Sequence, residues 1–264
     1  MKRLTPARRL GLLMLALLLA ATALGTLWWP VDPLTQDLGA SLRHPDAQHW
    51  LGTDLLGRNV LARLLEATQR SLWLAALTVA LAALPGAALG LWASARGGRW
   101  ERTLVMLADA AQSLPALLLV LLVATLAQGA PWGLAAGLAC TLWVEWFRIT
   151  RAVAGPTWGS EAVQASRLLG FGLGYLLRHH LWPALATVWA ALLPLALAQT
   201  VLTLAALGFI SVGVQPPAAE LGAMMIEALP TYDEAPWCLA APVLVLLWLV
   251  AATVLLASAQ EAAE

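Results

Sequence analysis

The sequence is poor in charge. Only 11% of its 264 residues are Asp, Glu, Lys or Arg, and the 15 basic side chains balance the 15 acidic ones. A net charge of zero gives no support for a basic surface that binds nucleic acid. With 61% hydrophobic residues, the chain has more apolar surface than an ordinary soluble domain of this length can hide.

Cysteine is also scarce. Cys140 lies inside an apolar run and Cys238 lies beside one, so the sequence predicts neither a disulfide framework nor a clustered zinc site. We expect both thiols to pack as small apolar groups. The Gly-x-x-x-x-Gly-Lys-Ser/Thr phosphate loop of ATP-binding chains is missing too. We therefore expect no catalytic residue, no metal site and no cofactor in this chain.

Long apolar runs are abundant. Six of them are nearly free of charge and long enough, at roughly 20 residues per span, to cross a bilayer as helices. They cover residues 11–29, 71–95, 103–127, 130–147, 184–210 and 239–258. The predicted fold class is therefore all-α, a polytopic membrane protein with six transmembrane helices.

The first apolar run follows four basic residues and ends in Trp28 and Trp29. Its length and its pair of interfacial indoles favour retention as a membrane helix. Cleavage as a signal peptide near Ala21-Thr22-Ala23 is the alternative. We predict an N-terminal transmembrane helix over 1–29, an external segment over 30–70 and a transmembrane core over 71–258.

Lys and Arg are distributed unevenly between alternate loops. Most of them precede the first run or fall in the segments 96–102 and 148–178, whereas the segment 30–70 keeps only four. The positive-inside rule therefore predicts that the N- and C-termini are cytoplasmic.

The inner segment 148–183 is basic, too short for an enzyme domain and too long for a plain turn. We predict a short helix over 160–169 within it, with Ser160 as N-cap and Gly170 as its C-terminal stop. A second helical stretch is expected over 173–181. Such a protruding helical element can dock on a partner protein, or it can lie on anionic lipid through Arg167 and Arg178. The residues alone leave both interpretations open.

Two stretches carry a resemblance to a known family. The inner string Glu161-Ala-Val-Gln-Ala-Ser166, with Gly170 and the closing 180–183, resembles the EAA coupling loop of ABC-importer permeases. The outer string Gly52-Thr-Asp-Leu-Leu-Gly-Arg58 resembles the stretch before the second span of nickel and di/oligopeptide permeases. Asn59 stands where that family has Asp, so an ion pair made by that acid becomes a neutral hydrogen bond.

The resemblance extends over residues 30 to 250. The segments 208–217 and 221–224 resemble the family's SFLGLGVxPP and WGxM strings. The match ends before the C-terminus, where the family continues with a GDxLRDxLDP tail and this chain reads 258–264 as Ser-Ala-Gln-Glu-Ala-Ala-Glu. We expect this departure to bear on activity rather than on the fold.

The resemblance implies an ABC type I importer permease fold in a bacterial inner membrane, and a translocation subunit rather than an enzyme. It implies four kinds of partner: a second permease subunit that completes a heterodimer, two cytoplasmic ABC ATPase subunits, an external substrate-binding protein and membrane lipid. The residues implied for the ATPase contact in the coupling loop are Glu161, Gln164, Ala165, Ser166, Gly170, His180 and Pro183. Those of the external motif are Gly52, Thr53, Asp54, Gly57 and Arg58.

The cargo is left open between two classes. The string 45–50 is most similar to nickel permeases, so nickel or a nickel chelate is expected, with di- or oligopeptides as the alternative. His44 and His49 are candidates for a transient metal site, although isolated loop histidines are more often solvated or cap a helix.

Two other classes of membrane protein are alternatives. A secondary transporter would show inverted repeats and buried charges, and a polytopic enzyme would bring His, Asp or Ser together at one depth. The sequence shows neither clearly, and its four histidines fall on opposite predicted sides.

Overall fold

The computed structural model describes residues 6–28, 31–126, 130–214 and 217–261. Every regular element among them is helical, apart from an isolated bridge between Thr53 and Asn59. The all-α prediction is therefore confirmed for this part of the chain. Trp29, Ala127 and the pair Gln215-Pro216, which fall in predicted runs and motifs, lie outside the described residues. The elements are α1 (Pro6–Trp28), η1 (Leu38–Ala40), α2 (Val60–Arg96), α3 (Gly98–Ser113), α4 (Ala116–Leu126), α5 (Pro131–Trp158), α6 (Glu161–Leu168), α7 (Leu173–Leu176), η2 (Leu177–Leu181), α8 (Trp182–Phe209), α9 (Leu221–Ala228), η3 (Leu229–Thr231) and α10 (Pro236–Glu261).

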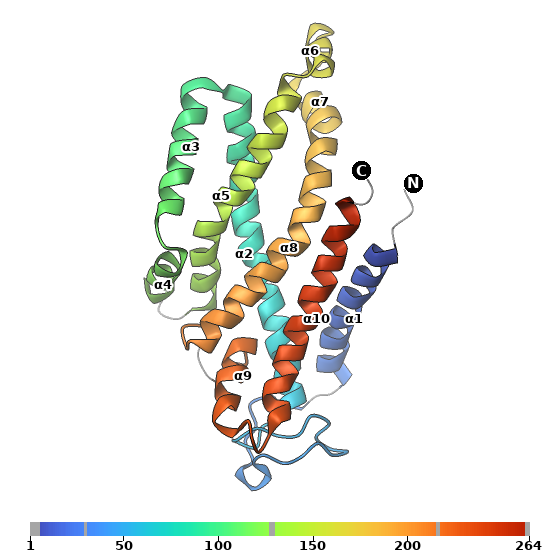
Figure 1. Ribbon diagram of the computed structural model, residues 1–264, viewed down its shortest axis with the longest axis vertical. Coiled ribbons are helices and arrows are strands. Elements are labelled where there is room, and N and C mark those ends of the chain that lie inside the picture. Colours follow the sequence, from blue (N-terminus) through green and yellow to red (C-terminus); the bar gives the residue numbers. More distant parts are fainter. Residues whose placement is uncertain (1–5, 29–30, 127–129, 215–216, 262–264) are drawn as a thin grey trace.

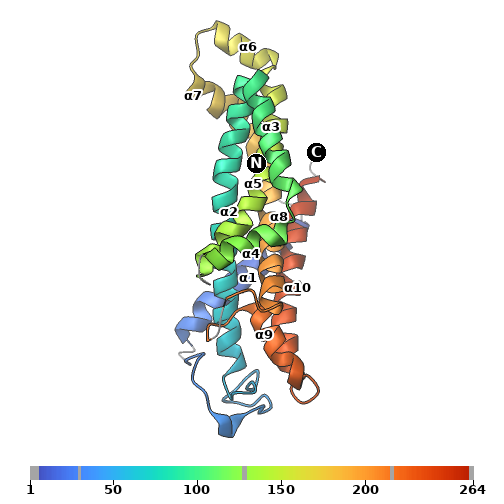
Figure 2. The same ribbon diagram turned by 90° about the vertical axis from the view of Figure 1, so that its left-hand side faces the viewer.

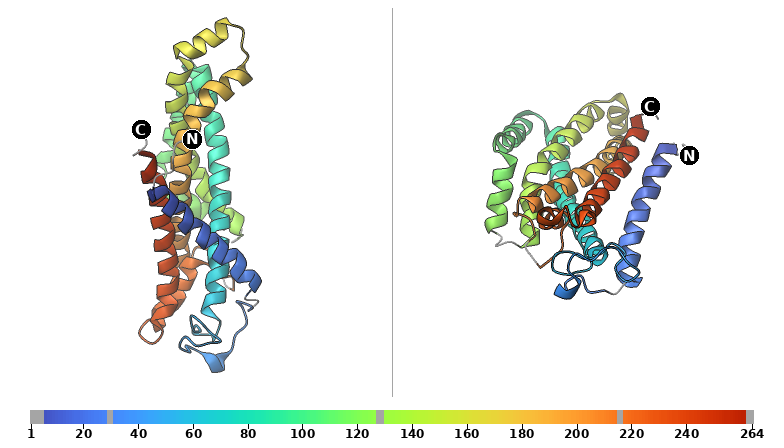
Figure 3. Two further views of the ribbon diagram at one scale, coloured as in Figure 1. Left: turned by 90° about the vertical axis from the view of Figure 1, so that its right-hand side faces the viewer. Right: turned by 60° about the horizontal axis from the view of Figure 1, so that its bottom comes forward.

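The long helices form an elongated bundle with two different ends. α6 and α7 lie together at one end, and the segment 31–59 and α9 lie at the opposite end (Figure 1). α2 runs through the bundle and packs against α5 and α8. α1 crosses α10 obliquely (Figure 3), where the Trp248 indole Nε1 donates to the Met14 carbonyl at 3.0 Å.

Small residues let α2 and α5 approach closely. A Cβ added at Gly90 would lie 2.7 Å from the Phe147 carbonyl oxygen and 2.9 Å from the Thr150 Cβ. A Cβ added at Gly86 would lie even closer to the Trp143 carbonyl oxygen. Membrane helices gain stability from this kind of contact because lipid supplies no hydrophobic drive between them. The pair α2 and α5 therefore forms the packed centre of the bundle.

Four described helices are long and apolar enough to cross a membrane: Pro6–Gly25, Val60–Arg96, Leu173–Phe209 and Pro236–Ala257. α3 and α4 would make a fifth span if counted together, but the chain bends by 85° between them. The single helix predicted over 103–127 is therefore wrong. Pro115 lacks an N–H and disfavours helical backbone at Leu114, which is extended at φ −82° and ψ 136°. Figure 2 shows α4 turned across the bundle axis.

The fourth predicted span, 130–147, forms the first part of α5. This helix does not stop at Phe147 but continues to Trp158, because its later residues pack against α2 and α8. It carries Glu145, Arg148 and Arg151 and is not among the helices apolar enough to count as a span. The number of six spans fits this helix order and stays a prediction.

Candidate functional site

The outer motif begins with a tightly hydrogen-bonded loop. The Thr53 Oγ1 accepts from the Arg43 N–H at 2.8 Å and donates to the Ala40 carbonyl, and the Thr53 N–H donates to the Arg43 carbonyl at 3.1 Å. The preceding Gly52 has a φ of +67°. Thr53 is fully buried, so its side chain fixes the loop and is not available to a partner.

Gly57 closes the next turn. Its φ is +72°, and its N–H donates to the Asp54 carbonyl at 2.9 Å. A Cβ at this position would run into the Asp37 carbonyl. Only glycine combines a left-handed backbone with such a close neighbour. The glycine of the predicted motif is therefore required by the fold of the outer segment.

Asn59 starts α2. Its side-chain oxygen accepts from the Ala62 N–H at 3.0 Å, which is the N-cap arrangement. The neutral hydrogen bond expected at this departure from the family pattern is thus a helix cap. A cap of this kind sets where α2 begins, and therefore which side chains of its first turn face the outer motif.

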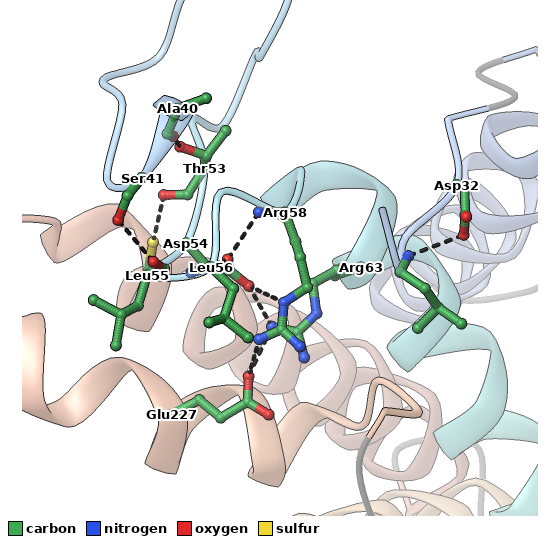
Figure 4. Close-up of polar contacts among 12 residues, drawn as sticks. Asp32, Ala40, Ser41, Thr53, Asp54, Leu55, Leu56, Arg58, Arg63 and Glu227 are labelled. Atoms are coloured by element: carbon green, nitrogen blue, oxygen red, sulfur yellow. Dashed lines mark hydrogen bonds and ion pairs between the residues drawn. The ribbon is translucent and has the colours of Figure 1, made fainter. Parts of the chain in front are cut away.

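That first turn completes a buried ion-pair network (Figure 4). Asp54 Oδ2 accepts from Arg58 Nε and from Arg63 Nη1, both at 2.7 Å. Glu227 Oε2 accepts from Arg58 Nη2 at 2.7 Å and from Arg63 Nη1 at 2.8 Å. The second oxygen of Asp54 also accepts from the backbone N–H groups of Leu56 and Arg58, each at 2.9 Å.

Burial makes this network more than a surface contact. The exposed fractions of the side chains are 2% for Arg63, 7% for Arg58, 13% for Asp54 and 32% for Glu227. Two cations face two anions, so the charges balance, and Coulomb attraction is strong where water is excluded. The network fastens the outer motif and the start of α2 to α9.

Sequence reasoning identified Asp54 and Arg58 but not Arg63 or Glu227 as site residues. Arg63 lies five positions after Arg58, just beyond the quoted outer string. The nearness of a second arginine to Asp54 in the sequence was the available signal. Glu227 is 164 positions from Arg63 along the chain. Nothing local in the sequence indicates that pairing.

Glu220 is a second buried acid at this end. It is 2% exposed, and its Oε2 caps α9 by accepting from Gly222 N at 3.0 Å and Ala223 N at 3.1 Å. Burial raises the pKa of this carboxyl, and the two backbone donors oppose that rise. A Cβ at Gly208 would clash with its Oε2, so Gly208 allows α8 to pack on the acid.

The outer histidines do not converge. The His44 ring lies against the Trp237 ring at a tilt of 49°, with ring centroids 4.8 Å apart, and His49 Nδ1 lies 3.3 Å from Asp46 Oδ1. The backbone N–H of His49 holds the pKa of the exposed Asp46 below its ordinary value. No group of three or more His, Cys, Asp or Glu that could hold a metal is found in the described part of the chain.

At the opposite end, the predicted coupling residues lie on and around α6. The Ser160 Oγ accepts from Val163 N at 3.4 Å, so its predicted N-cap role is confirmed. Val163 is fully buried in a cluster with Trp158, Leu176 and Leu181. This apolar contact holds α6 against α5, α7 and η2.

Gly170 ends the short helix as predicted. Its φ is +84°, and no atom of this chain lies within 4 Å of a Cβ built on it. The turn therefore requires left-handed backbone, while the space beside Gly170 is open. Open space at a glycine leaves room for a partner to approach the backbone.

Of the remaining predicted coupling-loop residues, some form hydrogen bonds to neighbouring elements and the others are exposed. Ser166 Oγ lies 2.9 Å from His180 Nε2, and Gln164 Nε2 donates to the Gly159 carbonyl at 3.0 Å. These contacts join α6 to η2 and to the end of α5. Glu161, Ala165 and Pro183 are exposed.

An exposed apolar surface surrounds these groups. Leu168 and Leu169 are 89% and 76% exposed. Phe171, Tyr175 and His179 stack in a row, with 4.1 Å between successive ring centroids. Sequence reasoning missed this surface, which we call the inner tip and define as Leu168, Leu169, Phe171, Leu173 and Tyr175. The signal was a pair of leucines placed directly before the helix-stopping glycine.

Comparison with known proteins places the chain in a family. Residues 86–263 match the model of the family described as binding-protein-dependent transport system inner membrane component. A Brucella suis biovar 1 protein to which a peptide permease role is attributed is 36% identical over 230 residues, or 86% of this chain and 76% of that protein. The nickel transport system permease protein NikC of Escherichia coli (strain K12) is 35% identical over 222 residues, 83% of this chain and 79% of its own length.

A third relative is more distant. The dipeptide transport system permease protein DppC of Haemophilus influenzae is 28% identical over 249 residues, 92% of this chain and 84% of that protein. Members of this family are transport components of the inner membrane, and they work with a substrate-binding protein and an ATPase. The chain belongs to the ABC-importer permease family of the nickel and peptide type.

Proposed function

We propose that this chain forms half of the translocation pathway of an ATP-driven importer, beside a second permease subunit with which it makes a heterodimer. The observation that carries the proposal is the inner tip. Its apolar side chains stand exposed at the end of α6, in the turn that follows it and on α7, and α6 is fixed to α5 and to the start of the α7–α8 helix by the cluster around Val163. Exposed apolar patches of this kind mark protein interaction sites.

Two cytoplasmic ATPase subunits would supply the energy, one of them docking on the inner tip with Glu161, Gln164 and Ala165 at the contact. Because the sequence has no phosphate loop, ATP would be hydrolysed on those partners. α6 is tied to η2 through Ser166 and His180, so closure of the ATPases would move α8 with it. Transport of this kind needs contacts that differ between an inward-open and an outward-open state.

The orientation follows from the same assignment. With the inner tip in the cytoplasm, the N- and C-termini are cytoplasmic and the segment 31–59 faces the external binding protein. The long helices then face membrane lipid and the second permease subunit. Cysteine labelling from each side of the membrane tests this orientation, and an externally reactive Leu169→Cys would contradict it.

Nickel or a nickel chelate is the cargo we propose. Support comes from the string 45–50 and from NikC, which is 35% identical. Peptide import is the second candidate, supported by the Brucella protein at 36% identity. The binding protein would make the choice, since the described residues of this chain hold no metal-binding cluster.

The test is uptake by vesicles that contain this chain, its permease partner and both ATPases, with the purified binding protein outside. ATP-dependent accumulation of nickel is expected, and accumulation of a dipeptide instead would support the second candidate. Leu168→Ser should abolish co-purification of the ATPases. The matched control Leu38→Ser, 71% exposed at the outer end, should leave it intact; equal behaviour of the two variants would contradict the docking assignment.

A further inference from the structure

A groove lies between α2 and α8, in the half of the bundle nearest α6 and α7 (Figure 1). Its volume is about 470 Å³, and Ala, Leu and Trp side chains line it. Small residues on both helices, such as Ala87 and Ala190, leave the groove open. A lining this apolar favours a hydrocarbon occupant, because a buried polar group would find no hydrogen-bond partner there.

The length of the groove matches one leaflet of a bilayer. On α8 its lining extends from Trp182 to Leu193, which is about 16 Å at 1.5 Å per residue. That is roughly half of the ~30 Å hydrocarbon core. Trp182, at the end nearest α7, is 57% exposed, and an exposed indole at the end of a span prefers the membrane interface. An extended acyl chain of one leaflet therefore fits the groove, with its headgroup beside Trp182.

A cation stands where that headgroup would lie. Arg178 and Trp182 line a second hollow, and Trp182 is shared between this hollow and the groove. Arg178 is exposed and takes part in none of the ion pairs found in the described part of the chain. Arg167, by contrast, lies over the Trp158 ring at 5.3 Å. A basic group at the cytoplasmic end of a gap between membrane helices is typical of sites for anionic lipid headgroups.

We propose that the groove holds one acyl chain of an anionic phospholipid and that Arg178 binds the phosphate of its headgroup. A helix of another subunit could also fill an apolar groove, but it would leave Arg178 without an anion, whereas a phospholipid supplies the chain and the charge in one molecule. Leu91 and Trp189 line the groove and also pack on the cluster that holds α6, so a bound chain would brace the base of the inner tip. Only the assignment to the cytoplasmic leaflet rests on the proposed function.

The experiment measures lipid retention by the full chain, released from detergent micelles, with native mass spectrometry. The probes are dioleoyl-phosphatidylglycerol and dioleoyl-phosphatidylcholine, which share their acyl chains but differ in net charge. One phosphatidylglycerol should be retained about fivefold more strongly than phosphatidylcholine, because a basic side chain near the surface favours an anionic lipid by this factor. Glycerol phosphate, which has the anion without the chains, should not displace it. Equal retention of the two lipids, or displacement by glycerol phosphate, would overturn the proposal.

Two variants separate the headgroup contact from the chain contact. Arg178→Gln should remove the preference for phosphatidylglycerol and leave retention of phosphatidylcholine unchanged. Ala190→Trp fills the groove and should lower the retention of both lipids. Arg99→Gln is the matched control, because Arg99 is exposed at the start of α3, near the same end of the bundle, and lines neither hollow; its lipid preference should stay that of the unsubstituted chain.

Equal behaviour of Arg178→Gln and Arg99→Gln would contradict the headgroup assignment, and this comparison decides even if Ala190→Trp fails to fold. Retention is also compared between the chain alone and its complex with the second permease subunit. Lipid that stays bound in the complex supports the proposal, whereas lipid displaced by the partner would assign the groove to the subunit interface and overturn it. The assay contains no ATP, so a lack of ATP-dependent uptake would sink the importer function alone, and a lack of headgroup preference would sink this inference alone.

Discussion

Loss of the Asp54 charge is the sharpest test of what holds the outer end together. Asp54→Asn keeps an oxygen that can accept from the backbone N–H groups of Leu56 and Arg58, now 2.9 Å away. It removes the anion that lies 2.7 Å from both Arg58 and Arg63. The two buried cations would then share only Glu227.

The expected cost is large for an isosteric change. Removing one partner of a buried ion pair typically costs about 3–5 kcal/mol, because the remaining charge stays buried without compensation. Asp54→Ala should cost more, since two backbone donors also lose their acceptor, at about 1 kcal/mol each. By contrast, the Glu66–Arg70 pair is partly exposed on both sides, and Glu66→Gln should cost about 0.2–1 kcal/mol.

Denaturant titration in detergent micelles, followed by tryptophan fluorescence, gives the difference in unfolding free energy between these variants. The double variant Asp54→Asn/Arg63→Met should be more stable than the sum of its single changes, because it removes the uncompensated cation. If Asp54→Asn costs no more than Glu66→Gln, the ion-pair network does not stabilise the outer end. In that case the reasoning from burial is wrong.

Three further predictions concern single residues. Gly57→Ala should destabilise the chain by more than the roughly 1 kcal/mol of a left-handed backbone alone, because its Cβ would meet the Asp37 carbonyl; Gly155→Ala, which meets no atom within 4 Å, serves as the control in the same titration. Glu220→Gln should flatten the pH dependence of stability: a raised pKa stabilises the fold at low pH, and this contribution is lost as pH rises through the pKa of the folded state. Thermal unfolding of both forms across the acid and neutral range measures this, and parallel curves would contradict it. Gly170→Val should leave the protein inserted yet uncouple ATP hydrolysis from uptake in vesicles, and normal transport by this variant would refute the docking assignment.

Local signals predicted the inner end well. Ser160 and Gly170 bracket α6 as expected, because an N-cap hydroxyl and a left-handed glycine act on their immediate neighbours. The helix predicted over 103–127 is broken at Pro115, although proline carries a local signal. Pro85 and Pro194 lie inside continuous helices, so sequence alone does not say which proline breaks a span and which one its neighbours accommodate.

The outer network was beyond local reasoning for a different physical reason. Asp54 and Arg58 pair across one turn and are only four positions apart in the sequence, so their ion pair is a local feature. Glu227 reaches them only because α8 and α9 fold back beside the start of α2. Such a contact depends on the packing of the whole bundle, and a sequence without an alignment holds no direct signal for it.

The helix order suggests how the two ends could act together. The apolar helix Leu173–Phe209 runs without interruption from the inner tip to Gly208, where Glu220 packs and α9 begins. Its first residues include the π-helical segment Leu177–Leu181, which contains His180, the residue tied to α6. π-helical turns are frequent at functional sites, and they are places where the hydrogen-bond register of a helix departs from the α pattern. A displacement of α6 would therefore reach Glu227, and with it the outer ion-pair network, through a single helix and one capped turn.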